Sequence, residues 1–104
     1  MSRTKLLNEI RSRLVRAHGE RLRGIVLYGS EARGQAGPES DIDLLVLLTS
    51  PVRYSRDLET NLTALYPLSL RIGRRISAKP AAADEYERAE SPLYQNARRE
   101  GVPV

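Results

Sequence analysis

The sequence contains no cysteine and a single histidine, His18, which excludes two common kinds of site. Without thiols the chain has no disulfide framework and no thiolate zinc site, and one imidazole cannot form a histidine cluster around a metal. Tryptophan and phenylalanine are also absent, and the five aromatic residues are all tyrosine. Metal chemistry in this chain therefore has to rely on hard oxygen ligands.

Long hydrophobic runs are missing as well. The longest apolar run, Leu44 to Leu48, is far shorter than the roughly 20 residues that cross a bilayer, so we expect no membrane association. No charged and then apolar leader opens the sequence, and we expect a cytoplasmic protein. A length of 104 residues is suited to one small domain, residues 1–104, around one core.

The charge balance is modestly basic, with 17 Lys and Arg against 13 Asp and Glu. Such a balance permits attraction to nucleic acid or to an acidic partner. The tyrosines are not interleaved with the basic clusters as a single-strand-binding surface requires, so nucleic acid is not directly indicated. We interpret most arginines as a solvated surface, but Arg71, Arg74 and Arg75 remain candidates for contact with a nucleotide phosphate or an acidic partner.

A small-residue turn follows the β-prone segment from Gly24 to Tyr28. Gly29 and Ser30 stand where this strand should end and a helix should start, and phosphates bind at such junctions. Glycine lets the backbone approach a phosphate closely, while a serine hydroxyl and nearby N–H groups donate to its oxygens. The turn is therefore a candidate site for a nucleotide triphosphate.

Two carboxylates follow this turn at a fixed distance. Asp41 and Asp43 lie two apart in a segment of branched apolar residues, so in a strand both project from one face while Ile42 and Leu44 face the core. Two hard oxygen ligands suit Mg²⁺, which the nucleotide would share. Either half of the motif alone is typical of an ordinary turn, and only their combination favours a nucleotide and metal site.

Hydrophobic periodicity predicts an α+β (α/β) chain. Apolar residues at helical spacing indicate a helix over Thr4 to His18, ended by Gly19, and another over Asp57 to Tyr66, stopped by Pro67. We expect strands over 24–28 and 41–48, a loop over 31–40, and a third strand somewhere within 68–78. Two short helices should follow, over 81–89 and from an N-cap at Ser91 to Gly101, before an apolar tail that frays by default.

The spacing of the two motif halves carries a family resemblance. Gly29-Ser30, ten intervening residues and the Asp-Ile-Asp of residues 41–43 resemble the signature of the polymerase-β-like nucleotidyltransferase superfamily. Within it, Gly-Ser-Glu-Ala-Arg-Gly followed by Ser-Asp-Ile-Asp-Leu-Leu-Val is similar to the minimal nucleotidyltransferases (MNT), usually encoded beside a HEPN-domain partner. The resemblance implies a small mixed β-sheet flanked by helices.

The resemblance also assigns roles to five residues. Gly29 and Ser30 would bind the nucleotide phosphates, Asp41 and Asp43 would bind the metal and carry catalysis, and Arg33 would support the triphosphate or its loop. The implied activity is Mg²⁺-dependent transfer of a nucleoside monophosphate, expected to be AMP from ATP, to a hydroxyl. By family analogy the acceptor is a tyrosine of a HEPN RNase toxin, which would make this chain the antitoxin of a toxin–antitoxin pair.

One part of the family pattern is absent. Active relatives carry a third carboxylate on the following strand, but residues 68–78 contain no acidic residue and alignment by eye puts Ser77 at that position. Two carboxylates could retain reduced activity, because phosphoryl-group transfer depends mostly on positioning and charge neutralisation. Asp84 and Glu85 are the nearest acidic alternatives, and we interpret them as a solvated helix face.

Three functions therefore remain in view. The first is the protein adenylyltransferase just described. The second is a catalytically weak or inactive protein of the same fold that neutralises its partner by binding, as the missing carboxylate suggests. The third, transfer to an antibiotic or to RNA, is disfavoured because the chain has neither an added substrate domain nor a long basic surface. The sequence leaves a homo-oligomer open.

Overall fold

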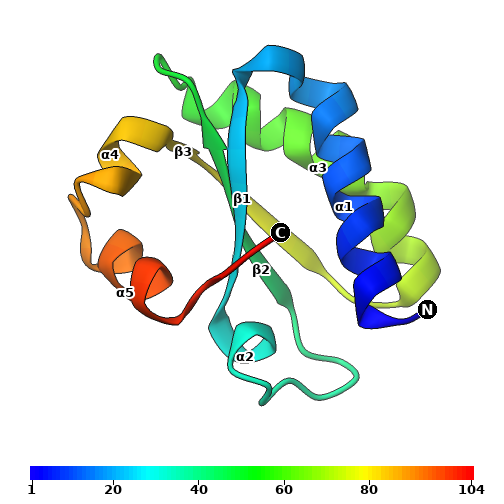
Figure 1. The fold of residues 1–104 in the computed structure, drawn as a ribbon. Coiled ribbons are helices and arrows are strands. Elements are labelled where there is room, and N and C mark those ends of the chain that lie inside the picture. Colours follow the sequence, from blue (N-terminus) through cyan, green and yellow to red (C-terminus); the bar gives the residue numbers. More distant parts are fainter.

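The computed structural model describes residues 1–104, in which a four-stranded sheet is flanked by helices (Figure 1). The elements in chain order are α1 (Arg3–His18), the 3₁₀ turn η1 (Gly19–Arg21), β1 (Leu22–Tyr28), α2 (Gly29–Ala32), β2 (Ile42–Leu48), α3 (Tyr54–Ile72), β3 (Ile76–Ala82), α4 (Ala83–Glu87), α5 (Pro92–Glu100) and β4 (Val102–Pro103). None of the helices is long and apolar enough to span a membrane.

The sheet is mixed. Its strand order is β3-β2-β1-β4, with β2 and β3 parallel and both other pairs antiparallel. A parallel pair needs a crossover, and α3 supplies it between β2 and β3. The α+β class and the helix-flanked mixed sheet expected from the sequence are thus confirmed.

The two faces of the sheet differ in what covers them. Alternate side chains of β2 point to opposite faces, so Ile42, Leu44 and Val46 are fully buried in the main core beneath α1 and α3. Leu45 belongs instead to a smaller cluster formed with α4 and α5 on the other face. In Figure 1, α1 and α3 lie on one side of the sheet and α4 and α5 on the other. Asp43 projects from this second, less covered face.

Helix α1 matches its sequence signals. Ser2 caps its first turn by accepting from the Lys5 N–H, and Gly19, at a φ of 59°, ends it. His18, at the last position, lies 2.6 Å from the Asn61 Oδ1 of α3 through its Nε2. Asn61 is fully buried and donates to the Ala78 carbonyl of β3. His18 thus belongs to a polar contact that joins α1, α3 and β3.

A second buried polar contact fixes the start of α3. Asp57 is 2% exposed and accepts from two guanidinium nitrogens of Arg21, at 2.9 and 3.1 Å. The same carboxylate accepts from the Arg53 N–H, one of the donors that a helix start leaves unpaired. These bonds hold the pKa of the Asp57 carboxyl below its usual range, with the Arg21 hydrogen bonds as the main cause.

The predicted end of the second helix is wrong. Pro67 lies inside α3, which continues to Ile72, so residues 68–72 are helical and the third strand begins at Ile76. Proline removes one backbone hydrogen bond, but Leu65 and Leu68 on either side are almost fully buried and their packing keeps the helix intact. The actual stop is Gly73, in the left-handed conformation at a φ of 69°, with its N–H bonded to the Ser69 carbonyl.

The C-terminal segment differs from expectation in two places. The helix expected from Ala81 begins at Ala83, because the two preceding alanines complete β3. The tail does not fray: it forms β4 beside β1, and the Val104 N–H bonds to the Ile25 carbonyl at 2.9 Å. The start of α5 is as predicted, with Ser91 capping it and Pro92 in its first turn.

Candidate functional site

The end of β1 brings the two halves of the sequence motif together. Tyr28, its last residue, pairs with Asp43 of β2, so Gly29 lies next to the Asp43 carboxylate. A Cβ built on Gly29 would lie 2.6 Å from Asp43 Oδ2, and Gly29 has a φ of 76°. Only glycine satisfies both conditions without a shift of the backbone or of the carboxylate.

The two aspartates occupy different surroundings. Asp41 is exposed and immediately precedes β2, which begins one residue later than the sequence predicts, whereas Asp43 lies within the strand and is partly buried. Burial raises the pKa of the Asp43 carboxyl and the charge of Asp41 raises it further, while Lys79, Arg75 and Arg33 act to lower it. Two neighbouring carboxylates, one of them desolvated, are a donor set that suits Mg²⁺.

Helix α2 carries the remaining motif residues. It has four residues and begins at Gly29, so the predicted strand-to-helix junction is present, with Ser30 in its first turn. The Arg33 that follows is exposed and pairs with Glu100 of α5 at 3.2 Å, while its Nε donates to Gln35. Arg33 therefore holds the loop after α2 through these two contacts. It affects the pKa of Asp43 only through its charge.

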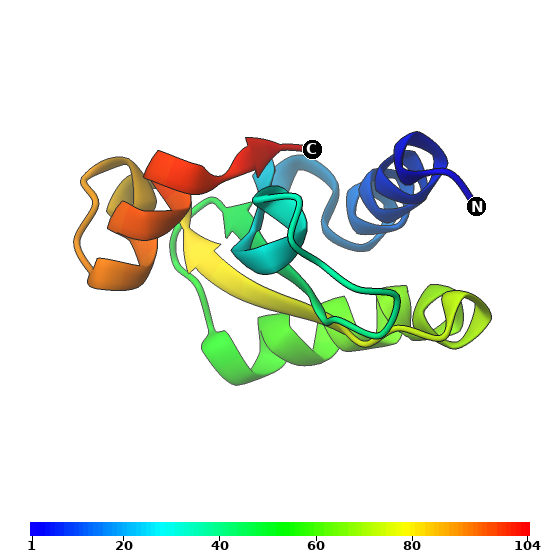
Figure 2. The same cartoon turned by 90° about the horizontal axis from the view of Figure 1, so that it is seen from below.

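The glutamate of the motif has a structural partner that sequence reasoning missed. Glu31 forms an ion pair with Arg74 at 2.6 Å, and both side chains are largely buried. The Nε of Arg74 also donates to the Ser40 carbonyl, just before Asp41. Figure 2 shows the loop after α2 beside the segment that joins α3 to β3, and Arg74 belongs to that segment. Arg74 thus connects both ends of the loop that separates the two motif halves.

The predicted cluster of three arginines is divided among different contacts. Arg74 is engaged by Glu31, and Arg71 pairs with Glu9 of α1 at 3.1 Å. Arg75 is exposed and takes part in none of the ion pairs of the chain. Of these three arginines, only Arg75 is therefore free to contact an anionic ligand.

The strand after α3 places Ser77 beside Asp43. The two residues are partners in the parallel register of β2 and β3, so their side chains project from the same face. No group of three or more His, Asp or Glu side chains in the structure is arranged to hold a metal ion. The position next to Asp43 on β3 thus holds a hydroxyl where a carboxylate would complete such a group.

Two further side chains share this face and were not identified from the sequence. Lys79 follows Ser77 by two residues on β3 and is partly buried. Tyr28 pairs with Asp43 from the other side, and burial followed by the charge of Asp43 raises the pKa of its hydroxyl to about 12. The period-two alternation of β3 would have found Lys79, but only with the strand placed correctly.

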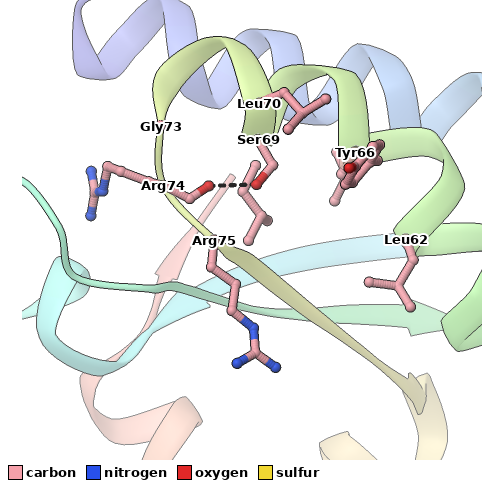
Figure 3. A pocket seen from close by; sticks show the side chains of 9 residues that line it. Leu62, Tyr66, Ser69, Leu70, Gly73, Arg74 and Arg75 are labelled. Carbon is pink, nitrogen blue, oxygen red and sulfur yellow. Dashed lines mark hydrogen bonds between the residues drawn. The ribbon is translucent and has the colours of Figure 1, made fainter.

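A groove of about 460 Å³ lies between α3 and the start of β3 (Figure 3). Leu62, Tyr66 and Leu70 of α3 line it and are all more than half exposed. Figure 3 shows the guanidinium groups of Arg74 and Arg75 extending away from these apolar side chains. Neither Asp41 nor Asp43 lines this groove, so it is separate from the carboxylate pair.

Known proteins identify the fold to which this site belongs. A family model described as a nucleotidyltransferase domain matches residues 6–95. Among curated proteins, none matches the chain significantly. A crystal structure of a toxin–antitoxin with AMP-PNP is similar to this chain, with 21% sequence identity and a TM-score of 0.66. The similarity covers 92% of this chain and 69% of the chain in that structure.

Two other solved structures have similar folds. One is spectinomycin adenyltransferase AAD(9) from Enterococcus faecialis, solved with ATP and spectinomycin, with 18% sequence identity and a TM-score of 0.72. The match covers 99% of this chain and 56% of the adenyltransferase chain. The other is a candidate minimal nucleotidyltransferase with 27% sequence identity and a TM-score of 0.58. The match covers all of this chain and 97% of the nucleotidyltransferase chain. The chain therefore belongs to the nucleotidyltransferase domain family and has the fold of the minimal nucleotidyltransferases that its sequence resembles.

Proposed function

We propose that this chain is a Mg²⁺-dependent nucleotidyltransferase that moves AMP from ATP to a hydroxyl group. The observation that carries the proposal is the approach of the Gly29 backbone to the Asp43 carboxylate. This approach would place the proposed phosphate-binding turn beside the proposed metal ligands. The solved structures with ATP and AMP-PNP support adenosine triphosphate as the nucleotide. The reaction would take place in the cytoplasm.

Each predicted site residue has a role in this proposal. Asp41 and Asp43 would hold Mg²⁺, which would neutralise charge on the triphosphate and polarise the reacting phosphoryl group. The backbone at Gly29 and the hydroxyl of Ser30 would bind phosphate oxygens. Arg33 would keep the loop after α2 in place through Glu100 and Gln35.

The proposed step is a single displacement. The oxygen of the acceptor hydroxyl forms a bond to the α-phosphorus, the bond from that phosphorus to the bridging oxygen breaks, and pyrophosphate leaves. The hydroxyl proton passes to water, because no carboxylate stands at the position of Ser77 to accept it. Positioning and charge neutralisation then account for most of the acceleration, and the rate is expected to be modest.

We further propose that the acceptor is a tyrosine of a HEPN-domain RNase toxin and that this chain is the antitoxin. Two similar structures are toxin–antitoxin complexes, one with AMP-PNP and one of a mutant MntA-HpeT pair. The second of these is 19% identical to this chain, with a TM-score of 0.61, and the match covers all of this chain and 72% of the chain in that structure. A protein acceptor is consistent with a chain that holds little beyond the nucleotide site.

Binding without chemistry is the second candidate function. The observation that favours it is Ser77, whose hydroxyl lies where a third carboxylate would stand beside Asp43. In that case the chain would neutralise its partner by contact and keep the carboxylate pair only for binding nucleotide.

One variant separates the two candidates. We would replace both aspartates, Asp41→Asn together with Asp43→Asn, and test the folded protein against the HEPN protein co-purified with it or encoded beside its gene. We expect the variant to lose label transfer from α-³²P-ATP and also neutralisation of the toxin. Retained neutralisation without transfer would support binding alone, and retained transfer would overturn the roles given to the aspartates.

A further inference from the structure

The candidate site carries less negative charge than a site for two metal ions needs. Ser77, the neighbour of Asp43 on β3, is uncharged, and no third acidic side chain joins Asp41 and Asp43 in a group that could hold a metal ion. Two-metal phosphoryl transfer relies on acidic side chains to hold both cations about 4 Å apart. The strands therefore provide ligands for one divalent ion.

Lys79 occupies the next position along this face of β3. Side chains alternate along a strand, so Ser77 and Lys79 project together, and their partners in the register are Asp43 and Leu45. Lys79 is partly buried and takes part in none of the ion pairs of the chain. A bound anion would give this half-buried ammonium the direct partner that it lacks within the chain.

The other cations near the carboxylate pair differ in how far they are engaged. Arg33 is held by Glu100 at 3.2 Å, whereas Arg75, just before β3, is exposed and has no ion-pair partner. One divalent ion would neutralise Asp41 and Asp43. Lys79 and Arg75 would then be the positive charges left to meet a triphosphate.

We propose that Lys79 binds the nucleotide phosphates and supplies the positive charge that a second metal ion would otherwise bring. The inference rests on the proposed function, which places the triphosphate beside Gly29 and Asp43. An ammonium is a compact charge with three donors, so it suits phosphate oxygens. The site consequently binds one divalent ion with its nucleotide and retains affinity for ATP when the metal is removed.

The first test measures ATP binding in excess EDTA by calorimetry. Lys79→Met should weaken metal-free binding by about tenfold or more, as loss of a hydrogen bond to a charged group does, while Lys79→Arg keeps most of it. Lys5→Met is the matched control, because Lys5 is the only other lysine and lies exposed on α1. Equal binding by wild type and Lys79→Met, or no binding by wild type, would overturn the inference.

The second test counts metal ions with Mn²⁺ as the probe. Electron paramagnetic resonance titration of the wild-type complex with ATP should show a single bound Mn²⁺ per protein, shared between the aspartates and the nucleotide. The double variant Ser77→Asp with Lys79→Met supplies a third carboxylate without the ammonium and should show a second. Two such ions in the wild type would contradict the proposal, as would a single ion in the folded double variant.

These tests do not depend on the transfer reaction. If Lys79→Met loses metal-free ATP binding while wild type transfers no label, the inference about Lys79 stands and the proposed activity falls. If wild type transfers label and Lys79→Met binds metal-free ATP normally, the activity stands and the inference falls. Thermal unfolding of each variant checks that the protein remains folded.

Discussion

The Cα of Gly29 stands so close to Asp43 that an added Cβ would lie 2.6 Å from the Oδ2 of its carboxylate. A real side chain never approaches an oxygen this closely, so either the turn or the carboxylate has to move when this position is occupied. Gly29 therefore fixes the position of the Asp43 carboxylate relative to the proposed phosphate-binding turn.

Gly29→Ala should reduce label transfer by about a hundredfold, because a displacement of the order of 1 Å in a catalytic group has that effect. Gly73→Ala is the control, since Gly73 has a similar φ of 69° but nothing within 4 Å of its added Cβ. Both variants carry the backbone penalty of about 1–2 kcal/mol, measurable by urea unfolding. Equal transfer rates in the two variants would show that the proximity to Asp43 is irrelevant.

Arg74→Met should destabilise the fold by about 1–3 kcal/mol, because it leaves Glu31 largely buried without its partner. The loop between α2 and β2 should also become more sensitive to limited proteolysis, since Arg74 holds the Ser40 carbonyl. Arg71→Met removes a more exposed pair with Glu9 and should destabilise the protein less, because solvent screens exposed ion pairs. Urea unfolding of both variants checks the difference, and equal losses would contradict it.

Asp57→Asn should destabilise the protein by about 1–3 kcal/mol at neutral pH, because Arg21 loses a charged acceptor. The folded pKa of Asp57 is lowered, so its stabilisation is present above the unfolded value of about 3.9 and is lost as pH falls through the folded value. The difference in the free energy of unfolding between wild type and variant should therefore become smaller in acid. If unfolding experiments show the same difference in free energy at neutral and acid pH, the stabilising role of the Asp57 carboxylate is contradicted.

Asp43→Asn should have the opposite effect on stability. The folded pKa of Asp43 is raised by burial and by Asp41, so the folded protein loses stability as pH rises from the unfolded pKa through the folded one. In the absence of metal the variant should unfold at a higher temperature than wild type at neutral pH. Added Mg²⁺ with ATP should stabilise wild type only, and a variant equally stabilised would show that Asp43 is not a ligand.

The sequence predicted elements whose signals are local. Helix α1 has apolar residues at helical spacing and a terminating glycine, and β2 alternates between two faces. The predicted bounds of both elements agree with the structure within one residue. Pro67 was misread because its local signal to stop a helix is outweighed by the burial of Leu65 and Leu68. That burial depends on the sheet beneath α3 and is not visible in the sequence.

The site was predictable to the same extent. The proximity of Gly29 to Asp43 could be predicted, because the motif spacing places Gly29 at the end of one strand and Asp43 near the start of the next. The pair of Glu31 with Arg74 and the position of Lys79 depend on residues more than thirty positions apart along the chain. The strand that carries Lys79 was expected to begin earlier, so its alternation could not be assigned from the sequence.

The decisive measurement compares α-³²P-ATP with γ-³²P-ATP as the label donor to the proposed HEPN-domain partner in the presence of Mg²⁺ and the wild-type chain. We expect label from the α position alone, with stoichiometric release of pyrophosphate, because the bond that breaks lies between the α-phosphorus and the pyrophosphate oxygen. Label from the γ position would mean phosphoryl transfer. No label from either position, with the partner still bound, would mean that the chain acts by contact and is not a nucleotidyltransferase in function.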